Sequence, residues 1–162
     1  MNNIYIIFGV SGCGKTTIGK LLSQSLAIPF LDADAFHPKE NIQKMTNGIA
    51  LTDTDRKPWL ENINRELIQQ SHQKGAVLAC SALKESYRKL LSKDIKHIEW
   101  MYLKGDFKTI QQRMQQREHF MNVNLLQSQF DTLEEPTYGM QISIEKLPEN
   151  ILSEILKILQ ES

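Results

Sequence analysis

The fold is decided by the stretch IYIIFGVSGCGKTTIGKLL, residues 4–22. Its first five residues form a continuous β-branched and aromatic run, which is typical of a strand buried on both faces in a parallel sheet. A glycine-rich turn follows, and apolar residues then recur at helical spacing from Ile18 to Leu26. This order predicts a buried strand, a tight loop and an amphipathic helix that packs on the sheet.

The loop between this strand and helix, GVSGCGKT (9–16), matches the phosphate-binding pattern G-x-x-x-x-G-K-[ST]. Glycines let successive backbone N–H groups converge on phosphate oxygens, and the helix N-terminus adds partial positive charge. We therefore expect Lys15 to reach the β- and γ-phosphates of a nucleotide and the Thr16 hydroxyl to bind Mg²⁺. The alternative, a glycine-rich turn without a ligand, is disfavoured by the strand before it and the helix after it.

The rest of the chain alternates between strands and helices. Four more strands are predicted at residues 30–32, 76–80, 97–103 and 140–144, with helical patterns between them. We expect the longest helix to run from Thr52 to Lys74, with Asp53 or Asp55 as its cap. Alternation of this kind predicts an α/β fold in one domain, residues 1–162, with a parallel sheet covered by helices on both faces. Two successive helical patterns over residues 113–136 interrupt the alternation and suggest a lid.

Composition excludes several functional classes. Lys+Arg and Asp+Glu are equal at 19 each, so no bulk charge attracts nucleic acid or an anionic membrane. No apolar run approaches the roughly 18 residues of a membrane span. Cys13 and Cys80 are far apart and fit no metal-ligand spacing, which indicates free thiols in a reducing compartment. We expect a cytoplasmic protein that binds neither nucleic acid nor membrane.

Two carboxylates, Asp32 and Asp34, follow the second predicted strand. Ligands of open α/β sheets bind at the carboxyl ends of strands, so both are candidate site residues. If the backbone stays extended, their side chains point the same way. We expect Asp32 to hold the metal, directly or through water, and Asp34 to orient a substrate hydroxyl for in-line attack. The alternative is that either residue caps the following helix.

Basic residues gather at other predicted strand ends and in the expected lid. Phosphoryl transfer spreads negative charge over oxygen atoms, so an arginine from a lid can stabilise it. Each of these residues can also be solvated surface, and the first histidine can cap a turn. The candidates are His37, Arg56, Lys57, Lys84, Arg88, Arg113, Arg117 and His119.

Five segments together resemble the small type of gluconokinase. They are GVSGCGKTTIG (9–19), FLDADAFHPKENIQKMTNGIALTDTDRKPWL (30–60), CSALKESYRKLL (80–91), YLKGDF (102–107) and REHFMNVNLLQSQFDTLEEP (117–136). The resemblance implies ATP- and Mg²⁺-dependent phosphorylation of D-gluconate to 6-phospho-D-gluconate. It also implies a homodimer and a three-layer P-loop kinase fold with a five-stranded parallel sheet and a helical lid, similar to shikimate and nucleoside monophosphate kinases.

The residue patterns and the resemblance together assign roles to individual residues. Catalysis would fall to Lys15, Asp34 and Arg117, and the metal to Thr16 and Asp32. ATP would be held by Gly9, Val10, Ser11, Gly12, Cys13, Gly14, Lys15, Thr16, Thr17, Arg113 and Arg117. The sugar acid would meet Asp34, His37, Arg56, Lys57, Lys84, Arg88 and His119, where the cations are assigned to its carboxylate on charge alone. The segment YGMQISIEKLPENI (138–151) matches loosely, and no adenine contact is assigned to it.

Related kinases and one other class are the competing hypotheses. Shikimate kinases carry a triple glycine after the third strand, where this chain has CSALK (80–84), and the Asp-Gly-Phe-Pro-Arg stretch of adenylate kinases is absent. A GTP-driven switch needs an Asn-Lys-x-Asp motif, which is also absent. A nucleotide-binding module without catalysis is disfavoured because Lys15, Thr16, Asp32 and Asp34 are all present.

Overall fold

A computed structural model of the chain describes residues 1–116 and 123–161. Its centre is a five-stranded parallel sheet in the order β2-β3-β1-β4-β5. The strands are β1 (Ile4–Phe8), β2 (Phe30–Asp32), β3 (Ala76–Cys80), β4 (Ile98–Lys104) and β5 (Met140–Ser143). The predicted α/β fold with five parallel strands is therefore confirmed, and strand ends differ from the predicted ones by one residue at most.

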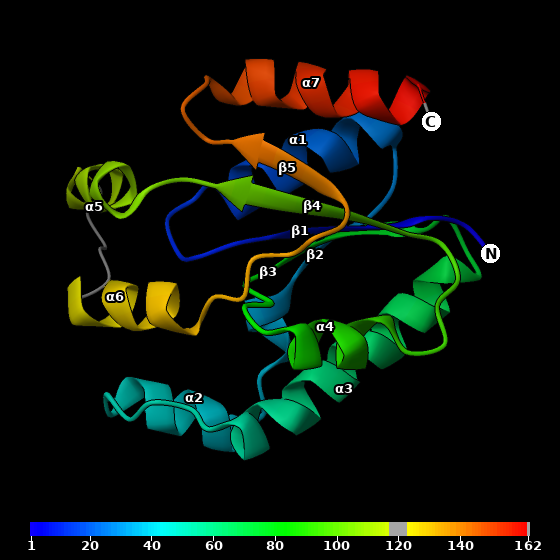
Figure 1. The fold of residues 1–162 in the computed structure, drawn as a ribbon. Helices are drawn as coiled ribbons and strands as arrows, with labels where there is room; N and C mark the ends of the chain where they lie inside the picture. The colour runs from blue at the N-terminus through cyan, green and yellow to red at the C-terminus, as the bar shows by residue number, and fades with distance from the viewer. Residues whose placement is uncertain (117–122, 162) are drawn as a thin grey trace.

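Helices cover both faces of the sheet (Figure 1). On one face, α1 (Lys15–Leu26) and α7 (Pro148–Glu161) pack against each other and bury Ile18, Leu22 and Ile155. The opposite face carries α3 (Asp53–Ser71) and α4 (Glu85–Ser92). Each layer contributes one apolar stripe to one of two cores that the sheet separates, as expected for a buried parallel sheet.

The remaining helices gather at the carboxyl edge of the sheet (Figure 1). They are the short 3₁₀ helix η1 (Ala33–Phe36), α2 (Lys39–Thr46), α5 (Phe107–Gln115) and α6 (Val123–Thr132). Because α5 and α6 follow β4, the neighbour of the central strand β1, they lie beside the loop that joins β1 to α1. Within the segment predicted as a lid, residues 113–136, the structure describes the end of α5 and the whole of α6, at the edge where ligands of such sheets bind.

The start of α3 differs from the prediction. Its cap is Thr52, not Asp53 or Asp55: the Thr52 hydroxyl accepts from the N–H of Asp55 at 3.1 Å, and Asp55 accepts from the N–H of Thr52 at 2.9 Å. This reciprocal pair satisfies two helix donors at once. A hydrogen bond from Lys44, followed by that from Thr52, lowers the pKa of Asp55 to about 2. The helix ends at Ser71 rather than Lys74.

The backbone after β2 is a second difference. It turns into η1 instead of staying extended, so the reason given for Asp32 and Asp34 pointing the same way was wrong. Asp32 caps η1, and its Oδ1 accepts from the N–H of Asp34 at 3.0 Å. The alternative reading, that one carboxylate caps the following helix, therefore holds for one oxygen of Asp32.

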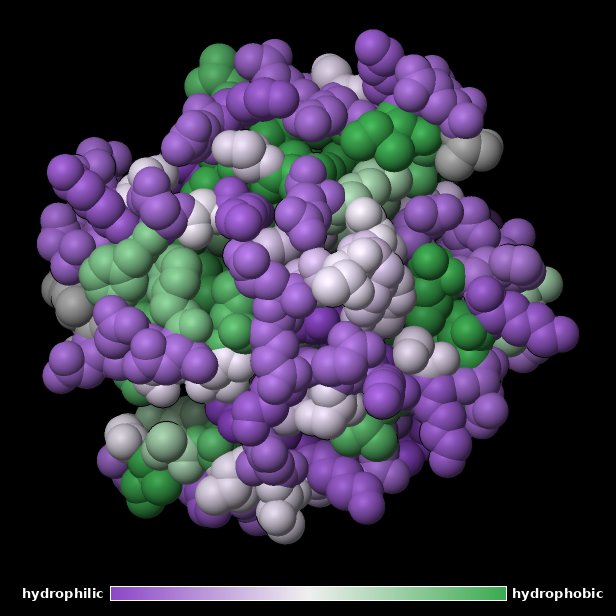
Figure 2. Space-filling model, in the orientation of Figure 1, coloured by the Kyte–Doolittle hydropathy of each residue, from purple (hydrophilic) through white to green (hydrophobic). Residues whose placement is uncertain are grey.

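Most of the surface in view is hydrophilic, with separate apolar areas (Figure 2). One such area lies over α2 and the turn after it, where Ile42, Met45 and Ile49 are each about half exposed. In the part of the chain that the structure describes, no helix combines the length and the apolar character needed to cross a membrane.

Candidate active site

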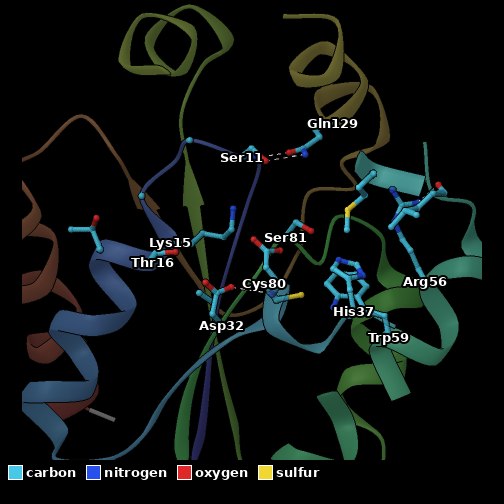
Figure 3. A pocket seen from close by; sticks show the side chains of 17 residues that line it. Ser11, Lys15, Thr16, Asp32, His37, Arg56, Trp59, Cys80, Ser81 and Gln129 are labelled. Atoms are coloured by element: carbon cyan, nitrogen blue, oxygen red, sulfur yellow. Dashed lines mark hydrogen bonds between the residues drawn. The ribbon is translucent and has the colours of Figure 1, made fainter. Parts of the chain in front are cut away.

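The phosphate loop has the backbone that its glycines permit. Gly14, which precedes α1, has φ 97°, a left-handed conformation that side chains disfavour. A Cβ on Gly9 would lie 2.8 Å from the backbone oxygen of Leu103, so only glycine lets β1 pass into the loop here. The Lys15 ammonium donates to the carbonyls of Gly9 and Val10 at 3.1 and 3.0 Å. These bonds fold the lysine back over the loop (Figure 3).

A cavity of about 570 Å³ opens beside this loop. Figure 3 shows Lys15 and Thr16 on one side of it and His37 and Arg56 on the other, with Asp32 between them. Ten of the predicted site residues line it: Ser11, Gly12, Gly14, Lys15, Thr16, Thr17, Asp32, Asp34, His37 and Arg56. The structure thus brings the phosphate loop, both carboxylates and two cationic or imidazole side chains around one space.

The carboxylates differ in their surroundings. Asp32 uses Oδ1 to cap η1, which leaves Oδ2 as its other ligand atom. Asp34 is exposed and lines the same cavity. Within residues 1–116 and 123–161, no cluster of three or more His, Cys, Asp or Glu side chains could hold a metal. A cation here would therefore need oxygen atoms from a bound phosphate or from water in addition to Asp32 and the Thr16 hydroxyl.

His37 is fixed by aromatic stacking. Its ring lies 4.2 Å from that of Trp59 at an interplanar angle of 13°, and Trp59 Nε1 donates to the carbonyl of Ala33 at 2.8 Å. Burial lowers the pKa of His37; the Asp34 carboxylate acts in the opposite direction, and Arg56 lowers the pKa further. The neutral imidazole is therefore the favoured form at neutral pH.

Of the four cations assigned to the sugar acid, Arg56 alone lines the cavity. Its Nη1 donates to the carbonyl of Leu51 at 2.9 Å and to the hydroxyl of Tyr87 at 3.1 Å. Its guanidinium also lies over the Tyr87 ring, 5.5 Å from the centroid. These contacts all orient one edge of the guanidinium, so its other nitrogens remain as donors to a ligand.

Two of the other cations lie outside the cavity lining. Lys57 is exposed on α3. Lys84 pairs with Asp53 at 3.1 Å, and the hydroxyl of Tyr87 donates to the same carboxylate at 2.5 Å. The Tyr87 and Lys84 hydrogen bonds lower the pKa of Asp53, and the Asp53 hydrogen bond raises the pKa of Lys84. The ammonium of Lys84 is thus neutralised by the protein itself.

Arg88 is a structural residue rather than part of the cavity lining. Only 1% of it is exposed, and its guanidinium lies over the ring of Phe8 at 4.9 Å. It donates to the carbonyls of Ala82 and Leu83 at 2.9 and 3.1 Å and also to that of Glu134. A local charge pattern cannot show this role, because the carbonyls come from segments about 50 residues apart in the chain.

A second cavity of about 360 Å³ lies on the other side of the phosphate loop. Gly12, Gly14 and Thr17 line both cavities. The second is also lined by Cys13, Ile18, Arg113, Glu145, Lys146, Leu147, Pro148 and Ile151. Arg113 is held there by a hydrogen bond of 2.6 Å from Nη2 to the carbonyl of Ile144. Residues 145–148 belong to the loosely matching segment, and no motif in it predicts a position beside the loop.

Gln129 on α6 is a cavity residue that sequence reasoning missed. Its Oε1 accepts from the N–H of Ser11 at 2.7 Å, and its Nε2 donates to the Ser11 hydroxyl at 3.0 Å (Figure 3). These bonds join the phosphate loop to a helix 118 residues further along the chain. Met45, Leu51, Trp59, Ala79, Cys80 and Ser81 complete the lining. The predicted residues Arg117 and His119 lie outside the described part of the chain.

The phosphate loop follows the central strand, and the carboxylates at the end of β2 face the same cavity. This arrangement defines a P-loop kinase. The sequence model of the shikimate kinase family matches residues 11–158 and places the chain in that broad class. More specific relatives were found by direct comparison. The chain is 37% identical to the thermoresistant gluconokinase of Escherichia coli K12, over 98% of this chain and 94% of that protein.

The other comparisons agree with this relative. A gluconokinase of Arabidopsis thaliana is 42% identical, over 98% of this chain and 93% of that protein. The crystal structure of a gluconokinase from Sinorhizobium meliloti 1021 superposes with a TM-score of 0.90 at 36% identity, over 98% of this chain and 92% of that one. The chain therefore belongs to the gluconokinase family.

Proposed function

We propose that this protein is a gluconokinase that transfers the γ-phosphoryl group of ATP to the 6-hydroxyl of D-gluconate, which yields 6-phospho-D-gluconate and ADP. The observation that carries the proposal is one cavity that joins the phosphate loop to Asp34, His37 and Arg56, in a chain that is 37–46% identical to curated gluconokinases. A sugar acid needs both a group that orients its hydroxyl and a cation for its carboxylate, and the two sides of this cavity offer them.

The two cavities suggest how ATP lies on the loop. Its phosphates would bind the backbone N–H groups of residues 9–17 and the Lys15 ammonium. The base would then lie in the second cavity, against Arg113 and the segment 145–148, because the loop glycines border both spaces. This direction leaves the terminal phosphate facing the cavity that holds Asp34.

Thr16 and Asp32 are the residues that would hold Mg²⁺. A hydroxyl and a carboxylate oxygen are ligands that Mg²⁺ prefers, and a site that relies on phosphate oxygens and water is usual for this ion. When bound, Mg²⁺ would neutralise negative charge that develops on the β- and γ-phosphates during transfer.

The protein's own groups then divide the remaining work. Asp34 accepts a hydrogen bond from the 6-hydroxyl and orients its oxygen for in-line attack. Lys15 stabilises charge on the transferred group, and on the sequence alone Arg117 is assigned to the lid and His119 to the substrate. Arg56 binds the carboxylate, whereas Arg88 and Lys84 act through protein contacts.

Two further features follow from membership of the family, and we propose them on that basis. The protein would act as a homodimer, which light scattering after size-exclusion chromatography tests directly. It would work in the cytoplasm, a reducing compartment in which the buried thiols of Cys13 and Cys80 would stay reduced.

One coupled assay tests the activity. ADP release is measured with ATP and Mg²⁺ in the presence of gluconate, shikimate, AMP or water alone. We expect release above the water control with gluconate only. Turnover of shikimate in place of gluconate would favour the alternative that the matching shikimate kinase model raises, and equal release in all four would reject kinase activity.

A further inference from the structure

We propose that Asn41 is a positioning residue, which holds the imidazole of His37 in the tautomer with its proton on Nε2. His37 would then meet the substrate as a hydrogen-bond donor and not as a base. The identity of that substrate rests on the proposed function, but the tautomer itself does not. Three steps lead from the contacts of Asn41 and His37 to this assignment.

The first step is the orientation of the Asn41 side chain. Asn41 is 3% exposed, and its Nδ2 donates to the backbone carbonyl of Asp55 at 3.0 Å. A carbonyl oxygen can only accept a hydrogen bond, so the NH₂ group of the amide must face it. The reverse orientation would bring two buried oxygen atoms together without a hydrogen between them. Because the backbone carbonyl does not titrate, it fixes the amide at every pH at which the protein is folded.

The second step is the state of His37 Nδ1. The same Asn41 Nδ2 lies 3.3 Å from this nitrogen. An amide NH₂ has two hydrogens, and the one that does not bond Asp55 is available to His37. Nδ1 must therefore offer a lone pair. In a neutral imidazole the proton is then on Nε2, the ring nitrogen that remains for a ligand in the cavity that His37 lines.

The third step is the cost of the other states of the ring. Stacking on Trp59 at 4.2 Å limits tilting of the imidazole. Protonation would direct an Nδ1–H toward the Asn41 NH₂, so Asn41 opposes the imidazolium form. Burial acts in the same direction, and Arg56 adds to it, whereas the nearby Asp34 carboxylate favours the charged form. The neutral ring with Nε2–H is the state that satisfies the contacts on all sides.

This assignment divides the two roles in the cavity. Asp34 is an acceptor and can orient the hydroxyl that attacks. His37 presents an N–H, which suits a hydroxyl oxygen or carboxylate oxygen elsewhere on the sugar acid. Together with Arg56 it would provide hydrogen-bond donors on the side of the cavity opposite the phosphate loop, where Figure 3 shows both residues.

The direct test is nitrogen NMR of the ligand-free protein. Two-bond ¹H–¹⁵N correlations distinguish the two neutral tautomers of each histidine, and the His37→Gln variant identifies the signals of His37. We expect the Nε2–H pattern at neutral pH. An Nδ1–H pattern in the unmodified protein would overturn the proposal, and this result needs no variant of Asn41 to fold.

Substitution of Asn41 tests the cause. In Asn41→Asp one carboxylate oxygen faces the Asp55 carbonyl, which should lower the stability of the fold, and the other can accept from His37. In the folded variant the proton should therefore move to Nδ1 and the His37 pKa should rise. The control is Asn64→Asp, which changes another buried amide, one that donates to the carbonyls of Leu91 and Lys93 on α4 and beyond it. A His37 signal unchanged in Asn41→Asp, or changed equally in the control, would contradict a positioning role.

Kinetics give an independent readout. If His37 donates to the sugar acid, Asn41→Asp should raise KM for gluconate about tenfold, the usual worth of one good hydrogen bond. Below the raised pKa of His37 the imidazolium again carries an Nε2–H, so the KM of the variant should fall back toward that of the unmodified protein as the pH is lowered. An unchanged KM and pH profile with the altered NMR signal would show that the tautomer is set by Asn41 but is not used by the substrate. Absence of any gluconate turnover in the unmodified protein would instead sink the proposed function and leave the NMR result standing.

Discussion

Replacing Arg88 by Met tests whether this arginine stabilises the fold or binds the substrate. The guanidinium is buried and donates to three backbone carbonyls, those of Ala82, Leu83 and Glu134. Met has a similar length and can lie over Phe8, so most of the packing is kept. What is lost is the set of hydrogen bonds, together with an ion pair to Glu85 at 3.0 Å.

The carbonyls decide the magnitude. Glu85 is 43% exposed and can regain water when its partner is removed, so its ion pair should contribute little. A buried acceptor left without a donor costs about 1–3 kcal/mol. The Leu83 carbonyl keeps the N–H of Glu134 as a donor at 2.8 Å, so the carbonyls of Ala82 and Glu134 are the two that lose theirs. Together they give a loss of about 3 kcal/mol, within the usual range for breaking a buried charged network. For a chain of this size that corresponds to a fall in Tm of about 6–12 °C.

The assay is urea unfolding followed by circular dichroism, with KM for gluconate measured where both proteins are folded. Arg65→Met is the matched control, because Arg65 is exposed on α3 and donates to Asn62 one turn earlier in the same helix. It should change stability by about 0.5 kcal/mol or less. An unchanged unfolding midpoint in Arg88→Met, combined with a large rise in KM, would refute the reasoning and return Arg88 to the substrate site.

Three further predictions concern the cavity. Asp34→Asn should lower kcat at least a hundredfold while ADP affinity, measured by calorimetry, stays within about threefold; equal losses in both would remove Asp34 from its role toward the hydroxyl. Gln129→Ala removes two hydrogen bonds to Ser11 and should destabilise the fold by about 1–2 kcal/mol in urea, whereas an unchanged midpoint would show that the bonds are worth nothing in solution. Burial raises the pKa of Cys80 to about 12, so its thiol should resist iodoacetamide at pH 8 until the protein unfolds, as peptide mass spectrometry can check.

The parts that sequence predicted well are those set by local patterns. Residues 4–22 predict a buried strand, a glycine loop and a helix in this order, and the structure has the same three elements there. The alternation of strands and helices likewise predicted the parallel sheet. Asp32 and Asp34 line the expected cavity, but the extended backbone that was expected to place them there is absent. They lie there because β2 ends at the carboxyl edge of the sheet, whatever conformation the backbone adopts after it.

The parts that it missed depend on contacts between distant segments. Charge alone could not separate Arg56 from Arg88, because the difference lies in which backbone carbonyls converge on each guanidinium. Gln129 had no signal of its own among many glutamines of the expected lid. The second cavity depends on residues 145–148, whose sequence matches the family loosely and whose place is set by packing of α7 against α1.

The placement of four cations has a consequence for how a sugar acid is selected. Lys84 is neutralised by Asp53, Arg88 by backbone carbonyls and Glu85, and Lys57 faces solvent. Arg56 is left to face the cavity, and its Nη1 is held by the Leu51 carbonyl and the Tyr87 hydroxyl. Its one ion pair among the described residues, to Asp53, is long at 4.0 Å, and that exposed carboxylate is shared with Lys84 at 3.1 Å, so most of the charge of Arg56 stays available to a ligand. Across the cavity stand Asp32 and Asp34, which repel a second anionic group. The geometry therefore favours a ligand with one carboxylate at the Arg56 end of the cavity and a hydroxyl at the phosphate end. Selection of this ligand depends on Asp32 and Asp34, which repel a further negative charge, as much as on Arg56, which attracts the carboxylate.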